Sequence, residues 1–338
     1  MRATLIVMAA MALLSTGSAA SAQQQVTVGI GGKTIISYLP VTIAELKGYF
    51  KDAGVTVELN EFRGGSRSVE ALVGGSIDIM VGSFEHPLLM QAKEVELVTV
   101  ALLTNSYGGV IGLHKSIAGT YKSPKDLKGT KIGVTAPGSA MAVMAARFLA
   151  KDKLTLDDVS VIGIGGGAGA VAMMKSGRVD AVAHADPVIS RLVLDGDIIP
   201  IADTRTNEGM QTIYGGAIAA ASINTTPSFV RKNEKAVRGF ATAIVRALHW
   251  MQTASIDEVV SIVPADYYTG DKAEYRKMLV ANMPTFSKDG RIPQAAAERT
   301  LEILVTANMR DRGSPQSVSK AYTNRFVDEA NAALRKSQ

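Results

Sequence analysis

An internal repeat with a period near one hundred residues constrains the fold of this chain most. Alternating apolar and β-branched segments predict strands, and the segments between Gly- or Pro-containing turns predict helices. The first copy alternates strand and helix over 26–30, 40–46, 55–59, 68–73 and 77–81. The second copy has the same order over 131–134, 141–150, 159–162, 168–175 and 179–182. The chain therefore contains two βαβαβ units.

The spacing of the two copies is nearly constant. Corresponding positions lie 104 residues apart for Val55 and Val159, 102 for Asp78 and Asp180, and 100 for Pro87 and Pro187. Any α/β protein shows some echo of this kind, but here GSID at 75–78 also matches GRVD at 177–180. We predict the α/β class with two similar lobes. Ligands bind at the carboxyl ends of strands in open α/β sheets, so a cleft is expected between the two sets of turns.

Composition removes several classes of function. The 338 residues include no Cys, which excludes disulfides, thiolate zinc sites, Cys nucleophiles and iron–sulfur clusters. The formal charge is +5, from 36 Lys and Arg against 31 Asp and Glu. No short stretch of the sequence, however, concentrates five charges of the same sign. Nucleic-acid binding needs a concentrated basic footprint, so we do not expect it.

The N-terminus predicts a secretory signal peptide over residues 1–22. Arg2 is followed by an apolar run at 5–14 and by small residues that end in Ala-Ser-Ala at 20–22. A membrane anchor is the alternative, but a spanning helix needs about twenty apolar residues. Cleavage is expected near Ala22. Because no Cys is available for lipid attachment, we predict a free protein in a Gram-negative periplasm.

Motifs for phosphate, dinucleotide or metal chemistry are incomplete. The segment 29–34 reads GIGGKT, but a phosphate-binding loop needs Gly where this chain has Thr27. The segment 163–169 is glycine-rich, but it does not match the dinucleotide motif GxGxxG. The last Gly of the motif falls on Ala168 when the motif starts at Gly163, and on Ala170 when it starts at Gly165. The four histidines, His86, His114, His184 and His249, show no metal-ligand spacing. No acid/base pair has a convincing spacing, so we predict no enzyme activity, no cofactor and no metal.

Glycine and hydroxyl turns directly before helices are the candidate binding elements. The first-turn amides of a helix lack intrahelical partners and lie at the positive end of its dipole, where they bind anions. Three turns fit: Gly65 and Ser66, Gly138 and Ser139, and Gly167 and Ala168. A Ser before a helix is often only an N-cap, so one turn alone is weak evidence. Three turns at equivalent places favour a small anion as ligand.

Short sequence pieces in both lobes carry a family resemblance. They are YLP at 38–40, AELKGYF at 44–50, GG at 64–65, GSID at 75–78, SPKDLKG at 123–129, KIGV at 131–134 and GRVDA at 177–181. Together they resemble the periplasmic solute-binding proteins of the nitrate, sulfonate and taurine class of ABC importers, which are related to thiamine-precursor binding proteins. The pieces are specific for the family and not for its ligand.

The resemblance implies a type II periplasmic-binding fold with two crossover segments, near 104–108 and 214–217. The implied domains are the signal peptide at 1–22, lobe 1 at 23–106 plus 217–338, and lobe 2 at 107–216, with helices from 256 onward packed on lobe 1. The resemblance also implies a pocket lined by Ser37, Tyr38, Gly65, Ser66, Ser83, Phe84, Asn105, Tyr107, Ser139, Ala140, His184, Asp186 and Tyr214.

Alternatives remain for several of these residues. Ser83 and Ser139 are equally compatible with plain helix capping. Tyr38, Phe84 and Tyr214 are equally compatible with core or hinge packing. Glu85 and Asp186 end equivalent strands, where solvated or structural carboxylates are the commoner case. Either carboxylate, if it faces the cleft, selects a ligand with an amine or ring N–H.

The predicted function is the extracytoplasmic solute-binding component of an ABC importer, which captures a small sulfonate or carboxylate between two closing lobes. Its expected partners are that ligand and an inner-membrane permease, and it is expected to act as a monomer. Two alternatives stay open, a thiamine-precursor (pyrimidine) binding protein and a ligand-binding input module for a membrane sensor. Enzymes on the same fold use Cys-bearing motifs that this chain lacks.

Overall fold

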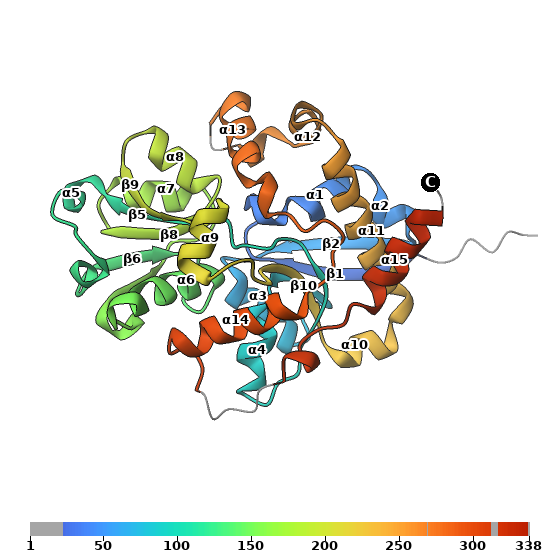
Figure 1. Ribbon diagram of the computed structural model, residues 1–338. Helices are drawn as coiled ribbons and strands as arrows, with labels where there is room; N and C mark the ends of the chain where they lie inside the picture. The colour runs from blue at the N-terminus through green and yellow to red at the C-terminus, as the bar shows by residue number, and fades with distance from the viewer. Residues whose placement is uncertain (1–22, 269, 312–316, 337–338) are drawn as a thin grey trace, which may run out of the picture.

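Two lobes, each built on its own sheet, form the molecule (Figure 1). The computed structural model describes residues 23–268, 270–311 and 317–336. One sheet contains β1 (Gln24–Ile30), β2 (Val55–Glu61), β3 (Ile79–Ser83), β4 (Val98–Leu102) and β10 (Ala221–Thr225). The other contains β5 (Gly109–His114), β6 (Lys131–Val134), β7 (Ser160–Gly163), β8 (Ala181–Ala185) and β9 (Ile198–Asp203). The predicted two-lobed α/β class is confirmed.

The two sheets have equivalent strand orders. They run β2-β1-β3-β10-β4 and β7-β6-β8-β5-β9 within the described residues. In each sheet the three strands of the βαβαβ unit are parallel, while β10 and β5 pair antiparallel with both of their neighbours. The carboxyl ends of the parallel strands therefore meet at one edge of each sheet, as the repeat predicts.

Helices cover both faces of the sheets. Those of the first half are α1 (Leu39–Leu46), α2 (Tyr49–Asp52), α3 (Gly65–Val73), α4 (Glu85–Gln91), α5 (Lys115–Ala118), α6 (Ala140–Leu149) and α7 (Ala168–Lys175). They are followed by α8 (Val188–Leu194), α9 (Asn207–Tyr214), α10 (Pro227–Lys232), α11 (Glu234–Thr253), α12 (Ile256–Ile262), α13 (Lys272–Asn282), α14 (Gln294–Thr306) and α15 (Arg325–Lys336). Short 3₁₀ helices lie at Ile36–Tyr38, Pro124–Leu127, Ala150–Asp152, Leu156–Asp158, Ala265–Tyr267, Met283–Thr285 and Val318–Lys320.

The long helix α11 shows how the core of the first lobe is built. Its apolar positions recur at helical spacing, and the buried side chains lie on one face. Phe240 packs on Phe50 of α2 with ring centroids 4.6 Å apart. Gly239 allows this close approach, because a Cβ there would lie 2.6 Å from the carbonyl oxygen of Ala53. The glycine thus places α11 directly against the α2–β2 turn.

The chain passes twice between the lobes. Residues 103–108 connect β4 to β5, and residues 215–220 lead from α9 back to β10, near the two predicted crossovers. Hydrogen bonds tie the crossovers to their surroundings: Ser106 Oγ donates to the carbonyl oxygen of Thr204 at 2.6 Å, and the Ile218 amide donates to that of Asn105 at 2.9 Å. The exact domain limits stay a prediction.

The C-terminal helices do more than cover the first lobe, on which the sequence places them. Asn282 at the end of α13 donates from Nδ2 to Asp186 Oδ2 of the second lobe at 2.8 Å. Glu274 of α13 lies 3.5 Å from Arg191 of α8. Helix α14 contacts α6 of the second lobe as well as α4 of the first. Elements from 272 onward therefore bridge the two lobes.

In the described ranges, no helix is long and apolar enough to cross a membrane. The predicted signal peptide over 1–22, with its cleavage near Ala22, lies outside the described residues.

Candidate ligand-binding site

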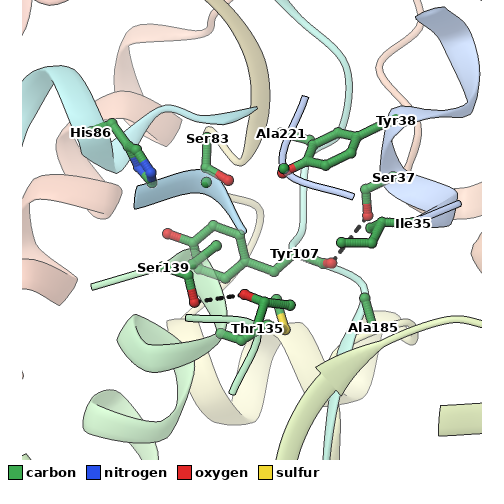
Figure 2. Close-up of a pocket in the computed structure, with 14 residues that line it drawn as sticks. Ile35, Ser37, Tyr38, Ser83, His86, Tyr107, Thr135, Ser139, Ala185 and Ala221 are labelled. Carbon is green, nitrogen blue, oxygen red and sulfur yellow. Dashed lines mark hydrogen bonds between the residues drawn. The ribbon is translucent and has the colours of Figure 1, made fainter. Parts of the chain in front are cut away.

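A cavity lies between the lobes, at the carboxyl ends of strands from both sheets (Figure 2). Its lining consists of Gly31, Ile35, Ser37, Tyr38, Gly65, Ser83, His86, Tyr107, Thr135, Ser139, Ala140, Met141, Ala185 and Ala221. Gly31 follows β1, Ser83 ends β3, Thr135 follows β6 and Ala185 ends β8. The cavity volume is about 30 Å³. A space of this size suits a ligand of only a few heavy atoms.

Two helices begin at the cavity wall. Helix α3 begins at Gly65, and α6 begins at Ala140 after the N-cap Ser139. Helix α1 adds no free amides there, because it continues the 3₁₀ helix Ile36–Tyr38, the Leu39 amide donates to the Ile36 carbonyl oxygen, and Pro40 has no N–H. The first amides of α3 and α6 have no intrahelical acceptor and point out of the N-terminal end of each helix. Each such end carries roughly +0.5 of an elementary charge from the aligned peptide dipoles. The backbone therefore gives the cavity a positive potential.

Close backbone contacts bring these helix ends together. A Cβ on Gly31 would lie 2.6 Å from the backbone nitrogen of Gly65. A Cβ on Gly64, whose φ is +97°, would lie 2.9 Å from the Cβ of Ala136 in the other lobe. Both distances are too short for a side chain. Gly31 allows the end of β1 to lie against the start of α3 within the first lobe, and Gly64 allows the two lobes to approach each other.

A buried polar group lies beneath the cavity. Glu85, at the start of α4, is fully buried, and Tyr107 donates from its hydroxyl to Glu85 Oε2 at 3.1 Å. Burial raises the pKa of Glu85 to about 8, although hydrogen bonds from its own backbone, Tyr107 and Ser83 lower it. The carboxyl is thus largely protonated and neutral at neutral pH. The Tyr38 side chain lies near this carboxyl: burial and then the charge of Glu85 raise the pKa of Tyr38.

His86 forms part of the cavity wall next to Glu85. Its side chain is 3% exposed, and burial lowers its pKa to about 4, so the imidazole is neutral at neutral pH. His86 Nδ1 lies 3.1 Å from Glu85 Oε1, within the distance of a hydrogen bond, although neither atom is in a hydrogen bond with the described residues. Among the described residues, neither ring nitrogen has a hydrogen-bond partner. Figure 2 shows the imidazole nitrogens directed toward the pocket.

Seven of the predicted site residues line this cavity. They are Ser37, Tyr38, Gly65, Ser83, Tyr107, Ser139 and Ala140. Ser37 Oγ donates to the Tyr107 carbonyl at 3.2 Å, and Ser139 Oγ accepts from Thr135 Oγ1 at 2.8 Å. Ser139 also accepts from the Ala142 amide, so it both caps α6 and faces the cavity. The capping and binding interpretations of Ser139 are therefore compatible.

The cavity does not include Phe84, Tyr214 or Ser66. Phe84 has no exposed surface and lies edge-on to Tyr322, with centroids 6.0 Å apart, in the core of the first lobe. Tyr214 lies behind Tyr107, perpendicular to it at 5.7 Å. Ser66 lines a neighbouring groove beside Gly138. For Phe84 and Tyr214 the structure shows the packing contacts that the sequence left open.

His184, Asp186 and Asn105 also lie outside the cavity. His184 Nε2 lies 2.7 Å from the carbonyl oxygen of Gly165, which ties the glycine turn to β8. Asp186 Oδ2 accepts from Arg205 Nη1 at 2.9 Å and from Asn282, and its backbone carbonyl accepts from the Ile36 amide at 3.1 Å. Asn105 is engaged through its backbone at the crossover. Asp186 is therefore a contact between the lobes.

The third predicted anion turn lies elsewhere. Gly167 caps α7 and Ala168 is its first residue, but both line outer grooves of the molecule. One groove also contains Arg63 and Arg67, both exposed, and Arg67 pairs with Glu70 of its own helix. Only two of the three predicted turns meet at the cavity.

The sequence did not single out seven lining residues. These are Gly31, Ile35, His86, Thr135, Met141, Ala185 and Ala221. Several follow or end a predicted parallel strand, so the strand-end rule was a signal that applied to them. No comparable signal pointed to His86, because its approach to Gly65 depends on how α4 packs on α3. In the described part of the chain, no group of three His, Asp or Glu side chains is arranged to hold a metal ion.

Solved structures resemble the whole described fold. A protein from Bordetella bronchiseptica RB50 is 41% identical, with a TM-score of 0.88 and coverage of 92% of this chain and 98% of that chain. The alkanesulfonate-binding protein SsuA from Xanthomonas axonopodis pv. citri, bound to MOPS, is 21% identical, with a TM-score of 0.67 and coverage of 89% and 98%. The periplasmic nitrate-binding protein NrtA from Synechocystis PCC 6803 is 19% identical, with a TM-score of 0.72 and coverage of 92% and 89%. The last two likenesses show the fold alone.

Sequence relatives are more distant. The protein YtlA of Bacillus subtilis (strain 168) is 23% identical over 238 residues, which cover 69% of this chain and 68% of YtlA. The 4-amino-5-hydroxymethyl-2-methylpyrimidine phosphate synthase THI11 of Saccharomyces cerevisiae is 32% identical over 97 residues, 28% of each chain. Residues 36–254 match the family described as NMT1/THI5 like, and this match covers more than half of the chain. The resemblance predicted from the sequence pieces is confirmed, and the chain belongs to the NMT1/THI5-like family.

Proposed function

We propose that this protein is the extracytoplasmic solute-binding component of an ABC importer and that it captures a small organic anion, a sulfonate or carboxylate, between its lobes. In this proposal the lobes close about the two crossovers, bury the ligand and present the closed surface to an inner-membrane permease. The protein acts as a monomer, and it binds its ligand without chemical turnover.

The observation that carries the proposal is the meeting of the N-termini of α3 and α6, one from each lobe, at one cavity whose lining contains no Lys, Arg, Asp or Glu. Each favourable anion contact at a helix end contributes about 0.3–1 kcal/mol, and up to about 2 kcal/mol when partly buried. Such contacts, with hydrogen bonds from the lining hydroxyl groups and apolar contacts to Ile35 and Met141, contribute to the roughly −8 kcal/mol of a micromolar complex.

The family and the similar structures support the same class of function. Two proteins of the same fold are described as binding an alkanesulfonate and nitrate, both of them anions. An extracytoplasmic location is further supported by the sequence pattern at 1–22. The permease partner follows from that location, because a captured solute needs a route across the inner membrane.

A pyrimidine-type thiamine precursor is the second candidate. Glu85 and His86 place a carboxyl and an imidazole next to the cavity, which suits a ring with N–H groups. The partial match to the yeast pyrimidine phosphate synthase favours the same ligand class. Asp186 does not favour it, because Arg205 and Asn282 occupy its Oδ2.

Thermal unfolding with a ligand panel tests the proposal. The panel contains methanesulfonate, longer sulfonates, carboxylates, nitrate, amines and pyrimidines. A bound ligand at one hundred times its Kd raises the free energy of unfolding by about 2.7 kcal/mol, which gives a clear rise in Tm. Stabilisation by sulfonates or carboxylates supports anion capture, and stabilisation by pyrimidines alone supports the second candidate.

The same panel also tests whether this protein is an enzyme, because turnover of its members can be measured. Turnover of any panel member, without stabilisation by the others, contradicts the capture proposal. Adjacency of the gene to an ATPase and a permease, rather than to a sensor kinase, separates the importer from an input module of a membrane sensor.

A further inference from the structure

His86 is a buried polar side chain that the fold leaves without partners. Within the described residues, both ring nitrogens lack a hydrogen bond, although the side chain is 3% exposed. A Cβ on Gly65 would lie 2.9 Å from His86 Nε2, so this nitrogen stands at the N-terminus of α3. His86 also lines the cavity. A buried polar atom is unfavourable unless it is paired, so a group bound in the cavity is the available partner.

The other ring nitrogen faces Glu85. His86 Nδ1 lies 3.1 Å from Glu85 Oε1, and Oε1 has no hydrogen-bond partner in the described part of the chain. The second carboxyl oxygen, Oε2, accepts from the Tyr107 hydroxyl. Tyr107 therefore holds one oxygen of the carboxyl, while the other oxygen faces the imidazole.

The protonation state of Glu85 determines whether His86 Nε2 is a hydrogen-bond donor or an acceptor toward the cavity. A neutral imidazole has one donor and one acceptor nitrogen. When the Glu85 carboxyl is protonated, its O–H faces Nδ1, and the ring proton is on Nε2, which is then a donor. When the carboxyl is ionised, its charge draws the ring proton to Nδ1, and Nε2 becomes an acceptor. An anion is bound in the first state and repelled in the second.

We propose that His86 Nε2 donates a hydrogen bond to the captured anion, and that Glu85 is the positioning residue that keeps Nε2 in the donor form. This inference rests on the proposed anion capture and assigns its specificity to one atom. A donor at Nε2 selects an anion that accepts a hydrogen bond at this position and does not donate one through an N–H group.

The titratable groups around Glu85 have pKa values far from neutral pH, so a pH titration reports on the Glu85 proton. Tyr107, Tyr38, Tyr214 and His86 are the titratable groups that face it, and Ser83 bonds to it. Burial raises the pKa of all three tyrosines far above the ordinary range, and the pKa of His86 is lowered to about 4. Glu85, with its pKa raised to about 8, is the member of this group that titrates near neutral pH.

The test measures the Kd of methanesulfonate by calorimetry from about pH 6 to about pH 10, because the charge of this probe is constant over that range. For the wild type we expect a constant Kd up to about pH 8 and a tenfold weakening for each further unit, because one proton is linked to binding. Glu85→Gln should bind with a Kd that does not change with pH. The Tyr107 hydroxyl keeps the amide oxygen on its side and leaves the NH₂ group to donate to Nδ1.

Two variants of His86 form a matched pair. His86→Gln retains a donor near the position of Nε2, and His86→Asn removes it, while both are neutral at every pH. We expect His86→Asn to bind methanesulfonate about tenfold to one hundredfold more weakly, as the loss of a hydrogen bond to a charged group requires. His86→Gln should retain most of the affinity and lose the pH dependence. Circular dichroism and Tm without ligand identify any variant that does not fold.

The outcomes separate this inference from the proposed function. If no anion of the panel stabilises the wild type at about pH 6, anion capture fails and the inference fails with it. If the wild type binds methanesulfonate but His86→Asn binds equally well, only the inference is overturned. A wild-type Kd that is constant to about pH 10 overturns the role of Glu85. The comparison of the wild type with the Glu85→Gln variant gives this result even if both His86 variants fail to fold.

Discussion

Glu85 is a carboxyl group held with no exposed surface between the cavity and the core of the first lobe. Water would stabilise its charged form, so burial raises its pKa to about 8. Its neighbour His86 is affected in the opposite direction, because burial disfavours the charged imidazolium. Both side chains are neutral at neutral pH. Glu85 and His86 therefore place no negative charge at the site that would repel an anion.

The raised pKa of Glu85 predicts how stability changes with pH. The folded state holds the Glu85 proton up to about pH 8, while the unfolded chain releases it near the ordinary value of 4.5. The free energy of unfolding therefore falls as pH rises between these values. His86 acts in the opposite direction from about pH 4 to 6.5, so the effect of Glu85 stands alone above 6.5. There we expect a slope of up to about −1.4 kcal/mol per pH unit, and Glu85→Gln should remove it.

Urea unfolding without ligand, from about pH 6.5 to about pH 8, measures this slope. Glu58→Gln is the control, because it removes an exposed carboxyl on β2 and should leave the wild-type slope unchanged. Equal slopes for the wild type and Glu85→Gln would show that Glu85 is ionised in the folded protein at neutral pH.

Among the elements, α6 combines structural and functional roles at its first turn. Ser139 caps the helix by accepting from the Ala142 amide, and the same residue lines the cavity. A cap that orders the first turn also aligns the amides of Ala140 and Met141 at the cavity wall. In the proposed function, the same local structure therefore caps the helix and binds the ligand.

Ser139→Ala tests the link between the cap and the site. Loss of the cap should cost about 1 kcal/mol of stability and should also weaken methanesulfonate binding severalfold, because the first turn frays. Ser255→Ala is the matched control: Ser255 caps α12 in a capping box with Glu258 and does not line the cavity. Urea unfolding and calorimetry measure the two effects. Equal methanesulfonate affinity for both variants would argue against a role of the α6 terminus in binding.

On the scale of the whole molecule, glycine contacts decide how closely the lobes approach. Gly64 of the first lobe faces Ala136 of the second lobe, and a Cβ on Gly64 would lie 2.9 Å from the Cβ of Ala136. Asp186 adds a polar contact across the same junction through the Ile36 amide and Asn282. Direct contacts between the lobes therefore hold them in this arrangement.

Gly64→Ala should hold the lobes apart. The added methyl meets Ala136, so we expect a larger radius of gyration with saturating methanesulfonate and at least a tenfold weaker Kd. Gly75→Ala is the control, because its φ of +74° also disfavours Ala but no atom lies within 4 Å of the added Cβ. Small-angle scattering and calorimetry compare the two variants. If Gly64→Ala closes as fully as Gly75→Ala, this contact does not limit closure.

Hydrophobic periodicity was enough to establish two α/β lobes, their strand-end loops and the helices that follow the Gly and Ser turns. These features depend on residues close together in the chain, so local spacing determines them. The turns at Gly65 and Ser139 were predicted in this way, and both line the cavity.

Only the tertiary structure decided which side chains face the cavity. Phe84, Glu85 and His86 are consecutive, yet the first lies in the core, the second lies beneath the cavity and the third lines it. Their directions depend on contacts with Tyr322, Tyr107 and Gly65, which are distant in the chain. The charge of Glu85 was likewise decided by burial, which arises only when the lobes and helices pack around it.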